Sequence, residues 1–490
     1  MSNPTIKKNL IYNTCYQVLS LLVPIITAPY AARIFGADGI GVQSYVGSIV
    51  AYFSIFAQLG TQAYGQREIA MCRDDKEAAS KTFWGIEIMS IITTCISLSL
   101  WGILTLFVGS YKVFFIVYSM SIINVAFDIS WFFIGYEQFK VILIRNSIIK
   151  IIIMAVLFGL CRDKSDLIIY IALTCLATLL GGMSLWPMLR KKLVKVPLKN
   201  LKIKKHFSKT LVYFIPTIAT SIYTVLDKVM IGVITGDRFA NGYYEQTTKI
   251  ATIATTFVTA INGVMYPRMS NLFAEKRMSE IKDKLKKSLD FLMFIAIPIS
   301  LGLIVISNDF IPFFFGPEYN QVINLLKVYS VLILITAISG CFGNQYLVPV
   351  GRRKESSKVI VAGAAINLVL NIFLIPYLKT MGAVIASIIS ETFILVIFFK
   401  MSNKFIGLID LWRVFWKRIL AGIIMCAVIL SSNMIPMAFT NNDWANKGIK
   451  VCIQIVLGAV VYFVSLCVMR DEGLKTYIKI IANKIKSIRK

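Results

Sequence analysis

The chain has 490 residues, of which 57% are apolar and only 16% are charged, and its mean hydropathy is +0.72. Soluble globular domains carry about 25% charged residues, so this composition excludes an ordinary soluble protein. The formal net charge of +27 indicates a nucleic-acid partner only if the basic residues gather on one surface.

Apolar runs long enough to span a membrane follow one another along the whole chain. A transmembrane helix needs about 20 mostly apolar residues, and no run shows the period of two that a transmembrane β-barrel requires. The first run lacks the small-residue cleavage site of a signal peptide, so we expect it to be retained. The sequence predicts an all-α polytopic membrane protein with about fourteen spans: 9–34, 41–66, 82–108, 112–135, 142–161, 166–189, 210–234, 242–267, 288–307, 323–349, 357–378, 380–400, 414–436 and 447–469.

The basic residues alternate between the two sides of these spans. With the N-terminus in the cytoplasm, 40 of the 52 Lys and Arg residues fall in the inner segments. This is the distribution that the positive-inside rule describes. It predicts that both termini are cytoplasmic, and it accounts for the positive charge without a nucleic-acid partner.

A basic segment, 190–209, separates the first six spans from the rest of the chain. Transporters are often built from repeated bundles, and an offset of 201 aligns 8–67 with 209–268 without gaps, pairing Gly41 with Gly242. The last residues place apolar side chains at helical spacing with lysines between them, as in a helix that lies on an anionic leaflet. We therefore expect the following parts: a six-helix lobe (1–189), a cytoplasmic linker (190–209), a second six-helix lobe (210–405), helices thirteen and fourteen (406–470) and an amphipathic cytoplasmic tail (471–490).

Motifs for enzymatic chemistry are missing from the sequence. It contains no P-loop, no H-E-x-x-H and no G-x-S-x-G. The nine cysteines lie singly, without paired spacing, so we expect no disulfide, metal site or cofactor. The one histidine, His206, lies in the basic linker, where we expect a solvated side chain. The longest outer segment, 308–322, is too short for the catalytic loops of a membrane glycosyltransferase.

Ionisable residues occur far from the ends of several spans, where a charge is expensive. Asp128 in span four and Lys150 in span five both lie roughly 12 Å from the inner side at 1.5 Å per residue, so the two can meet. Asp227 in span seven and Lys249 in span eight are matched in depth in the same way. Because they can neutralise each other, each pair is a candidate helix-to-helix contact.

Three further charges stand apart from these pairs. Arg33 closes the first span near the outer side, Glu391 lies near the middle of span twelve, and Glu87 is interpreted as a packing or snorkelling residue.

Two interpretations of the buried charges stay open. In the structural one, the pairs neutralise each other and hold helices together. In the functional one, the cations face a hydrated cavity and bind an anion: Arg33, Lys150 and Lys249. The acids then balance charge or carry a coupling proton: Asp128, Asp227 and Glu391.

The stretch 11–75 resembles the start of bacterial polysaccharide flippases, the Wzx-like oligosaccharide-lipid branch of the multidrug/oligosaccharide/polysaccharide exporter superfamily. The fourteen spans and the two-lobe layout extend the similarity over the whole chain. The matching positions are Pro24, Pro29, Tyr30, Arg33, Gly36, Gly41, Gly60, Tyr64-Gly65 and Arg67-Glu68.

This resemblance implies a secondary transporter of the bacterial plasma membrane. Its substrate would be a polyprenyl-diphosphate-linked oligosaccharide, a precursor of capsule, O-antigen-like or teichoic-acid-like polymer, moved to the outer leaflet by alternating access. Coupling to H⁺ or Na⁺ or to the membrane potential is implied, and one copy of the chain suffices. Among the candidate site residues, Arg33 alone occupies a motif position. The alternatives are a drug or organic-cation exporter of the same superfamily, and a membrane glycosyltransferase or polymerase.

Overall fold

The computed structural model describes residues 4–190, 192–197, 201, 203–403, 407–432, 441–475 and 477. Side chains are described from Leu22 onward, apart from some positions within 216–224 and 408–414. In this part of the chain the regular structure is helical, without strands. By the contacts between Cα atoms the chain divides into two compact units, Met1–Gly242 and Tyr243–Lys490. The lobe boundaries expected from the sequence remain a prediction.

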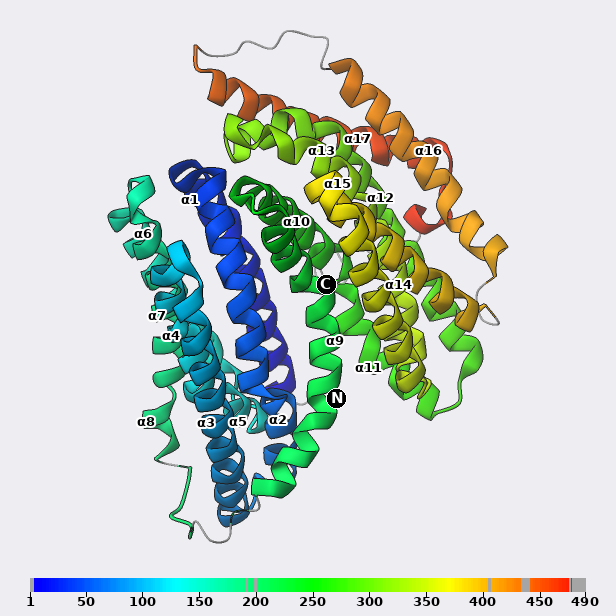
Figure 1. Ribbon diagram of the computed structural model, residues 1–490. Helices are drawn as coiled ribbons and strands as arrows, with labels where there is room; N and C mark the ends of the chain where they lie inside the picture. Colours follow the sequence, from blue (N-terminus) through cyan, green and yellow to red (C-terminus); the bar gives the residue numbers. More distant parts are fainter. Residues whose placement is uncertain are drawn as a thin grey trace. The chain divides into compact units, whose positions relative to one another are not determined.

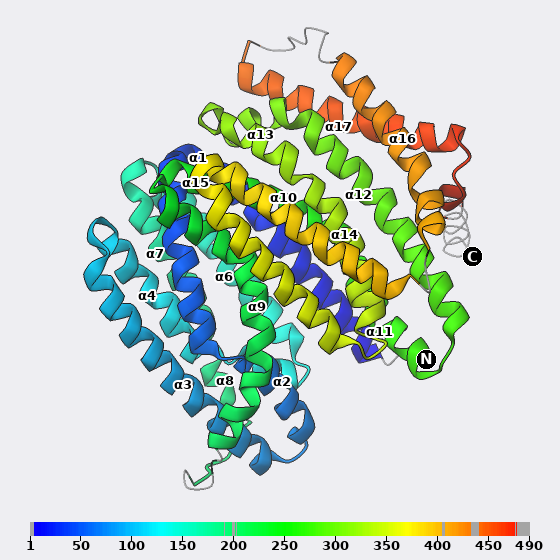
Figure 2. The ribbon, with the colours of Figure 1, turned by 45° about the vertical axis from the view of Figure 1, so that its right-hand side comes forward.

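The first unit is a bundle in which α3, α4, α6 and α7 run side by side (Figures 1 and 2). The helix α9 packs against α1, α2 and α3. The helices of this unit are α1 (Pro4–Gln58), α2 (Thr61–Cys72), α3 (Lys76–Phe107), α4 (Lys112–Phe127), α5 (Ser130–Gly135), α6 (Phe139–Leu160), α7 (Leu167–Met183), α8 (Trp186–Leu189) and α9 (Ile203–Thr235).

The second unit begins inside α10 (Arg238–Thr259) and is organised around α12 (Met278–Phe314), which packs against α13, α14, α16 and α17. A π-helical turn at Gly343–Leu347 follows α14. The other helices of this unit are α11 (Ile261–Ala274), α13 (Asn320–Tyr329), α14 (Val331–Phe342), α15 (Arg353–Ser402), α16 (Leu408–Ser432) and α17 (Asp443–Val468).

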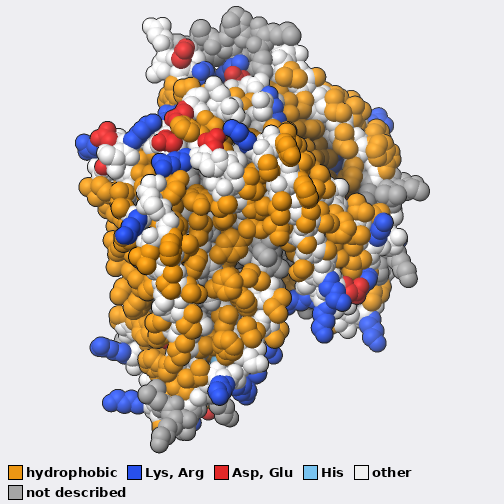
Figure 3. All heavy atoms as spheres, viewed as in Figure 1, with side chains coloured by type: hydrophobic (Ala, Val, Ile, Leu, Met, Phe, Trp, Pro, Cys, Tyr) orange, Lys and Arg blue, Asp and Glu red, His pale blue; other side chains and the backbone are white. Residues whose placement is uncertain are grey.

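Eleven helical segments of the described chain are long and apolar enough to cross a membrane. Two of them contain a turn, because Gly36 in α1 (φ 68°) and Lys379 in α15 (φ 48°) leave the helical conformation. The helix α9 covers the predicted seventh span but is not among the eleven. On the face shown in Figure 3, apolar side chains cover the middle of the helices and Lys and Arg gather towards their ends. The predicted all-α polytopic fold is confirmed, and the helices are compatible with fourteen spans.

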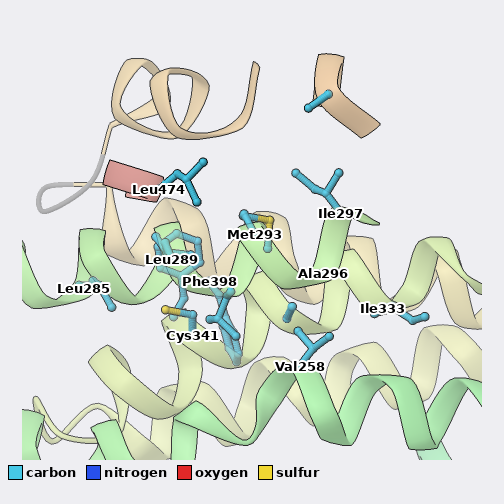
Figure 4. Close-up of a cluster of buried hydrophobic side chains, with 14 of the residues drawn as sticks. Val258, Leu285, Leu289, Met293, Ala296, Ile297, Ile333, Cys341, Phe398 and Leu474 are labelled. Carbon is cyan, nitrogen blue, oxygen red and sulfur yellow. The ribbon is translucent and has the colours of Figure 1, made fainter. Parts of the chain in front are cut away.

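The core of the second unit forms along one face of α12 (Figure 4). Apolar residues recur on this helix every three or four positions, which places them on one stripe. They pack against Cys341 of α14, Phe398 of α15 and Leu474, which follows α17. The stripe consists of Leu285, Leu289, Leu292, Met293, Ala296 and Ile297.

A buried ion cluster fastens the chain after α17 to this core. Arg418 of α16 is fully buried, and its Nη2 lies 2.6 Å from Asp290 Oδ1 and 3.3 Å from Asp471 Oδ1. The hydroxyl of Tyr477 donates to Asp290 Oδ2 at 2.6 Å. A buried guanidinium is tolerated because two carboxylates neutralise it. Of the predicted amphipathic tail, 471–490, the part from 478 lies outside the described residues.

Two glycines of the first unit permit a close backbone contact between α1 and the start of α10. A Cβ atom on Gly41 would overlap the carbonyl oxygen of Arg238, and a Cβ atom on Gly242 would overlap that of Ala37. The offset of 201 found in the sequence pairs Gly41 with Gly242 and Ala37 with Arg238. The contact is therefore reciprocal, as a duplicated arrangement would give.

Residues near Gly60, within the stretch 11–75, pack against the N-terminal part of α9. Gly60 has a left-handed conformation (φ 79°), and a Cβ atom there would lie 2.8 Å from the amide nitrogen of Phe214. Arg67 Nη1 donates to the hydroxyl of Tyr213 at 3.1 Å. These contacts give the motif a structural role, since they hold α9 against α2.

His206 belongs to the same contact, and the expectation that it is a solvated linker residue is wrong. Its side chain is 8% exposed, and Nδ1 lies 2.8 Å from the hydroxyl of Tyr64. Burial lowers the pKa of His206; nearby Glu68 opposes this shift, and Lys205 and Lys209 add to it. Water is excluded from the imidazole ring because α9 folds onto α2. The basic sequence around His206 does not reveal this contact.

The glycine contact predicts a steric effect. Replacing Gly41 or Gly242 by Ala should destabilise the protein by about 3 kcal/mol or more, because the added methyl group meets backbone that cannot rotate away. Thermal unfolding of the detergent-solubilised protein measures this loss. Gly159→Ala is the matched control, since nothing lies within 4 Å of a Cβ atom there. Equal stability of the three variants would contradict the contact.

The burial of His206 predicts a pH effect on stability. Its pKa is lower in the folded than in the unfolded chain, so protonation favours unfolding, and stability is lost as the pH falls below about 6.5. The unfolding temperature of the wild type should therefore drop more on acidification than that of His206→Gln, which cannot be protonated. Parallel pH curves for the two proteins would show that His206 is exposed to solvent.

Candidate functional site

The fourth predicted span, 112–135, is interrupted at Asp128. The helix α4 ends at Phe127, Asp128 has φ −82° and ψ 88°, and α5 starts at Ser130. The indole nitrogen of Trp186 donates to the carbonyl oxygen of Phe127 at 2.9 Å, which satisfies one backbone group freed by the break. Broken helices at membrane depth are tolerated where they are buried in protein or line a cavity, and they mark many transporter sites.

The carboxylate of Asp128 stabilises this break. Its Oδ1 accepts from the amide nitrogen of Ser130, two residues later, at 3.1 Å and from the Ser130 hydroxyl. Its Oδ2 accepts from Gln62 Nε2 of α2 at 3.1 Å. Both carboxylate oxygens therefore act as acceptors, and they connect the break to α2 and α5.

The helix α7 approaches the break closely at Gly182. A Cβ atom there would lie 2.7 Å from Asn124 Oδ1 and 3.2 Å from the amide nitrogen of Asp128. A side chain at this position would collide with the break, so glycine at 182 allows α7 to pack directly against it.

A cavity of about 360 Å³ opens beside the break, between α1, α4, α6 and α7 of the first unit. Asp128 and Lys150 both line it, so the two residues matched by depth in the sequence do face a common space. The remaining wall consists of one arginine, of threonine and asparagine side chains, and of apolar or aromatic residues and glycines: Val23, Thr27, Asn124, Arg145, Asn146, Ile149, Ile153, Met154, Leu157, Tyr170, Thr174, Ala177, Thr178, Gly181 and Gly182.

Arg145 is a second cation of this cavity that the sequence analysis missed. It lies at the start of the predicted span 142–161 but was counted with the inner segment, 136–146. The helix α6 in fact begins at Phe139, so Arg145 is already inside it. Its Nη1 donates to the carbonyl oxygen of Gly181 at 2.7 Å, which holds the guanidinium against α7. Only the fold of α6 onto α7 reveals this placement.

The other predicted site residues do not line this cavity. Arg33 lies on α1 with an exposed side chain. Asp227 of α9 is 3% exposed and lies near Tyr52 of α1. In the second unit, Lys249 pairs at 3.5 Å with Glu245, one turn earlier on α10, a partner that the sequence analysis did not consider.

Glu391, also in the second unit, is 8% exposed on α15. The buried polar residues Asn367 and Ser387 belong to the same helical segment, and Asn367 Nδ2 donates to Ser387 Oγ at 3.4 Å. Glu391 therefore shares its helical segment with other buried polar side chains.

The cavity of the first unit is suited to an anionic group. Two cations and one carboxylate line it, and neutral hydroxyl and amide groups surround them. Arginine offers paired donors that match phosphate geometry. Among the described residues no group of three or more His, Cys, Asp or Glu side chains could hold a metal ion.

Comparison with known proteins identifies the family. Residues 6–273, more than half of the chain, match the family described as polysaccharide biosynthesis protein. The chain belongs to this family. The resemblance inferred from residues 11–75 is thereby confirmed.

Two relatives illustrate the similarity. A putative O-antigen transporter of Escherichia coli (strain K12) is 25% identical over 408 residues, 82% of this chain and 98% of its own. A probable low-salt glycan biosynthesis flippase, Agl15 of Haloferax volcanii, is 21% identical over 65% of each chain.

Solved structures share the fold. The inward closed conformation of the Lipid II flippase MurJ matches with a TM-score of 0.72 at 18% identity, over 94% of this chain and 99% of that one. An inward-facing multidrug resistance MATE family transporter matches with a TM-score of 0.59 at 12% identity, over 80% and 95% of the two chains. At these identities the likeness concerns the fold alone.

Proposed function

We propose that this chain is a flippase that moves a polyprenyl-diphosphate-linked oligosaccharide from the inner to the outer leaflet by alternating access. The glycan would be a precursor of capsule, O-antigen-like or teichoic-acid-like polymer. The family and the names of the relatives, an O-antigen transporter and glycan flippases, support a transporter over an enzyme.

The observation that carries this proposal is the cavity beside the broken helix. A cation at membrane depth is expensive unless it faces water or a counter-charge. Lys150 and Arg145 share one cavity with a single carboxylate, that of Asp128, which already accepts hydrogen bonds from Ser130 and Gln62. A diphosphate would supply the negative charge that complements both cations.

We assign the predicted site residues the following roles within this function. The cations bind the diphosphate or steer it along its path: Arg33, Lys150 and Lys249, with Arg145 added. The acids balance charge or bind a coupling ion, H⁺ or Na⁺: Asp128, Asp227 and Glu391.

We further propose that the chain lies in the bacterial plasma membrane with both termini in the cytoplasm. The excess of Lys and Arg in alternate segments supports this orientation. A single chain supplies two compact units, so a monomer is sufficient for alternating access.

A drug exporter is the second candidate, because MATE transporters share the fold. An organic cation would require an acid-dominated site. The cavity of the first unit instead carries two cations and one carboxylate, which favours an anionic substrate.

The proposed function predicts that Lys150→Ala lowers polymer export by at least about tenfold, since a hydrogen bond to a charged group contributes about 1.5–3 kcal/mol. Arg33→Ala should also lower export. Surface polymer is measured in cells that depend on this chain, with protein levels checked in the membrane fraction. Lys287→Ala is the control, because Lys287 is exposed and pairs only locally with Asp283. Full export by both Lys150→Ala and Arg33→Ala would refute anion binding.

A further inference from the structure

Glu87 of α3 is a buried acid that the proposed function does not yet use. Its side chain is 1% exposed, which agrees with the packing alternative and not with snorkelling, and Oε1 has no hydrogen-bond partner among the described residues. Buried polar atoms are nearly always paired in native proteins. This one therefore calls for an explanation.

The environment of Glu87 opposes a negative charge. Phe83, one turn earlier on the same face of α3, is completely buried in an aromatic cluster with Trp131 and Phe132. An ionised carboxylate without water or a cation costs several kcal/mol in such surroundings. A carboxyl group placed there is stable when it carries a proton.

Asp128 connects Glu87 to the cavity. The helix α3 packs against α1, α2, α4 and α9. On the same face of α3, Phe83 stacks on Trp131 of α5 with 5.5 Å between the ring centroids, so this face packs beside the break at Asp128, whose charge acts on Glu87. From α9, His206 lies against Gly85, two residues before Glu87. Asp128 also lines the cavity with Lys150 and Arg145. A change of charge in the cavity therefore alters the electrostatic potential at Glu87 through Asp128.

A line of buried hydroxyl groups extends from Glu87 towards the opposite end of α3. Four buried hydroxyl residues follow Glu87 on α3: Ser90, Thr94, Ser97 and Thr105. Each is separated from the one before it by three, four or eight residues, so all four lie on the same face of the helix as Glu87. The hydroxyl of Thr94 has no hydrogen-bond partner among the described residues. The face of α3 that carries Glu87 is therefore partly polar.

We propose that Glu87 is a proton-binding residue whose occupancy is linked to the substrate cavity through Asp128. The proposal rests on the proposed function and adds a site to it. With the cavity empty, the cations Lys150 and Arg145 partly offset the charge of Asp128. A bound diphosphate cancels that offset, so the potential at Glu87 becomes more negative and the proton is held more tightly. Loss of the anion reverses the change and favours release of the proton.

The protonation of Glu87 can be tested without transport. Infrared spectra of the purified chain in nanodiscs should show the C=O stretch of a protonated carboxyl group, and Glu87→Gln should remove part of that band. Glu280→Gln is the control, because Glu280 is exposed and pairs with Arg277, so its ionised carboxylate adds nothing to the band. Because Gln has the shape of the neutral acid, Glu87→Gln should also unfold at the wild-type temperature.

The link to transport is tested by the pH dependence of export. Polymer export by wild-type cells should change between acidic and neutral medium, whereas Glu87→Gln should export at a rate that no longer responds to medium pH. Glu280→Gln should keep the wild-type response.

Two outcomes overturn the proposal. An unchanged carboxyl band in Glu87→Gln would show that Glu87 is ionised, and an unchanged pH response of export would show that its proton is not linked to transport. Failure of the proposed function is seen separately, since it would leave export intact in Lys150→Ala and would not affect the infrared band.

Discussion

The cost of a charge at membrane depth is the constraint on which this structure depends. Each buried charge needs a partner, and the partners differ by place. Arg418 has two carboxylates and fastens the end of the chain to α12. Asp128 has hydrogen bonds from Ser130 and Gln62 and borders a cavity with Lys150. Sites of the first kind stabilise a unit, whereas a site of the second kind leaves room for a ligand.

Interrupted helices are the second feature that shapes the site of the first unit. The turn at Gly36 only reverses the chain, and its positive φ is easily reached by glycine. The break at Asp128 has another character, because it occurs within a span and turns polar backbone and a carboxylate towards the cavity. Gly182 on α7 is small enough to accept this wall. We infer that the interruption of the fourth span and the charges of the cavity belong to one site.

Depth and composition were sufficient to predict the helices and the shared location of Asp128 and Lys150, and the resemblance of residues 11–75 to known flippases predicted the family. They could not predict features that depend on packing between distant segments. No Pro or Gly marks the break at Asp128, and the place of Arg145 in the cavity depends on the packing of α6 against α7. His206 lies in a basic run but is buried by the folding of α9 onto α2. Depth alone predicted Asp227 as the partner of Lys249, whereas in the structure Lys249 pairs with Glu245 on the same helix.

The most direct test of the central claim is an experimental structure of the chain bound to farnesyl diphosphate, a soluble polyprenyl diphosphate. The account predicts phosphate oxygens within hydrogen-bonding distance of Lys150 Nζ or Arg145, in the cavity beside Asp128. Phosphate bound elsewhere, with this cavity filled by acyl chains or closed by dry packing, would contradict it.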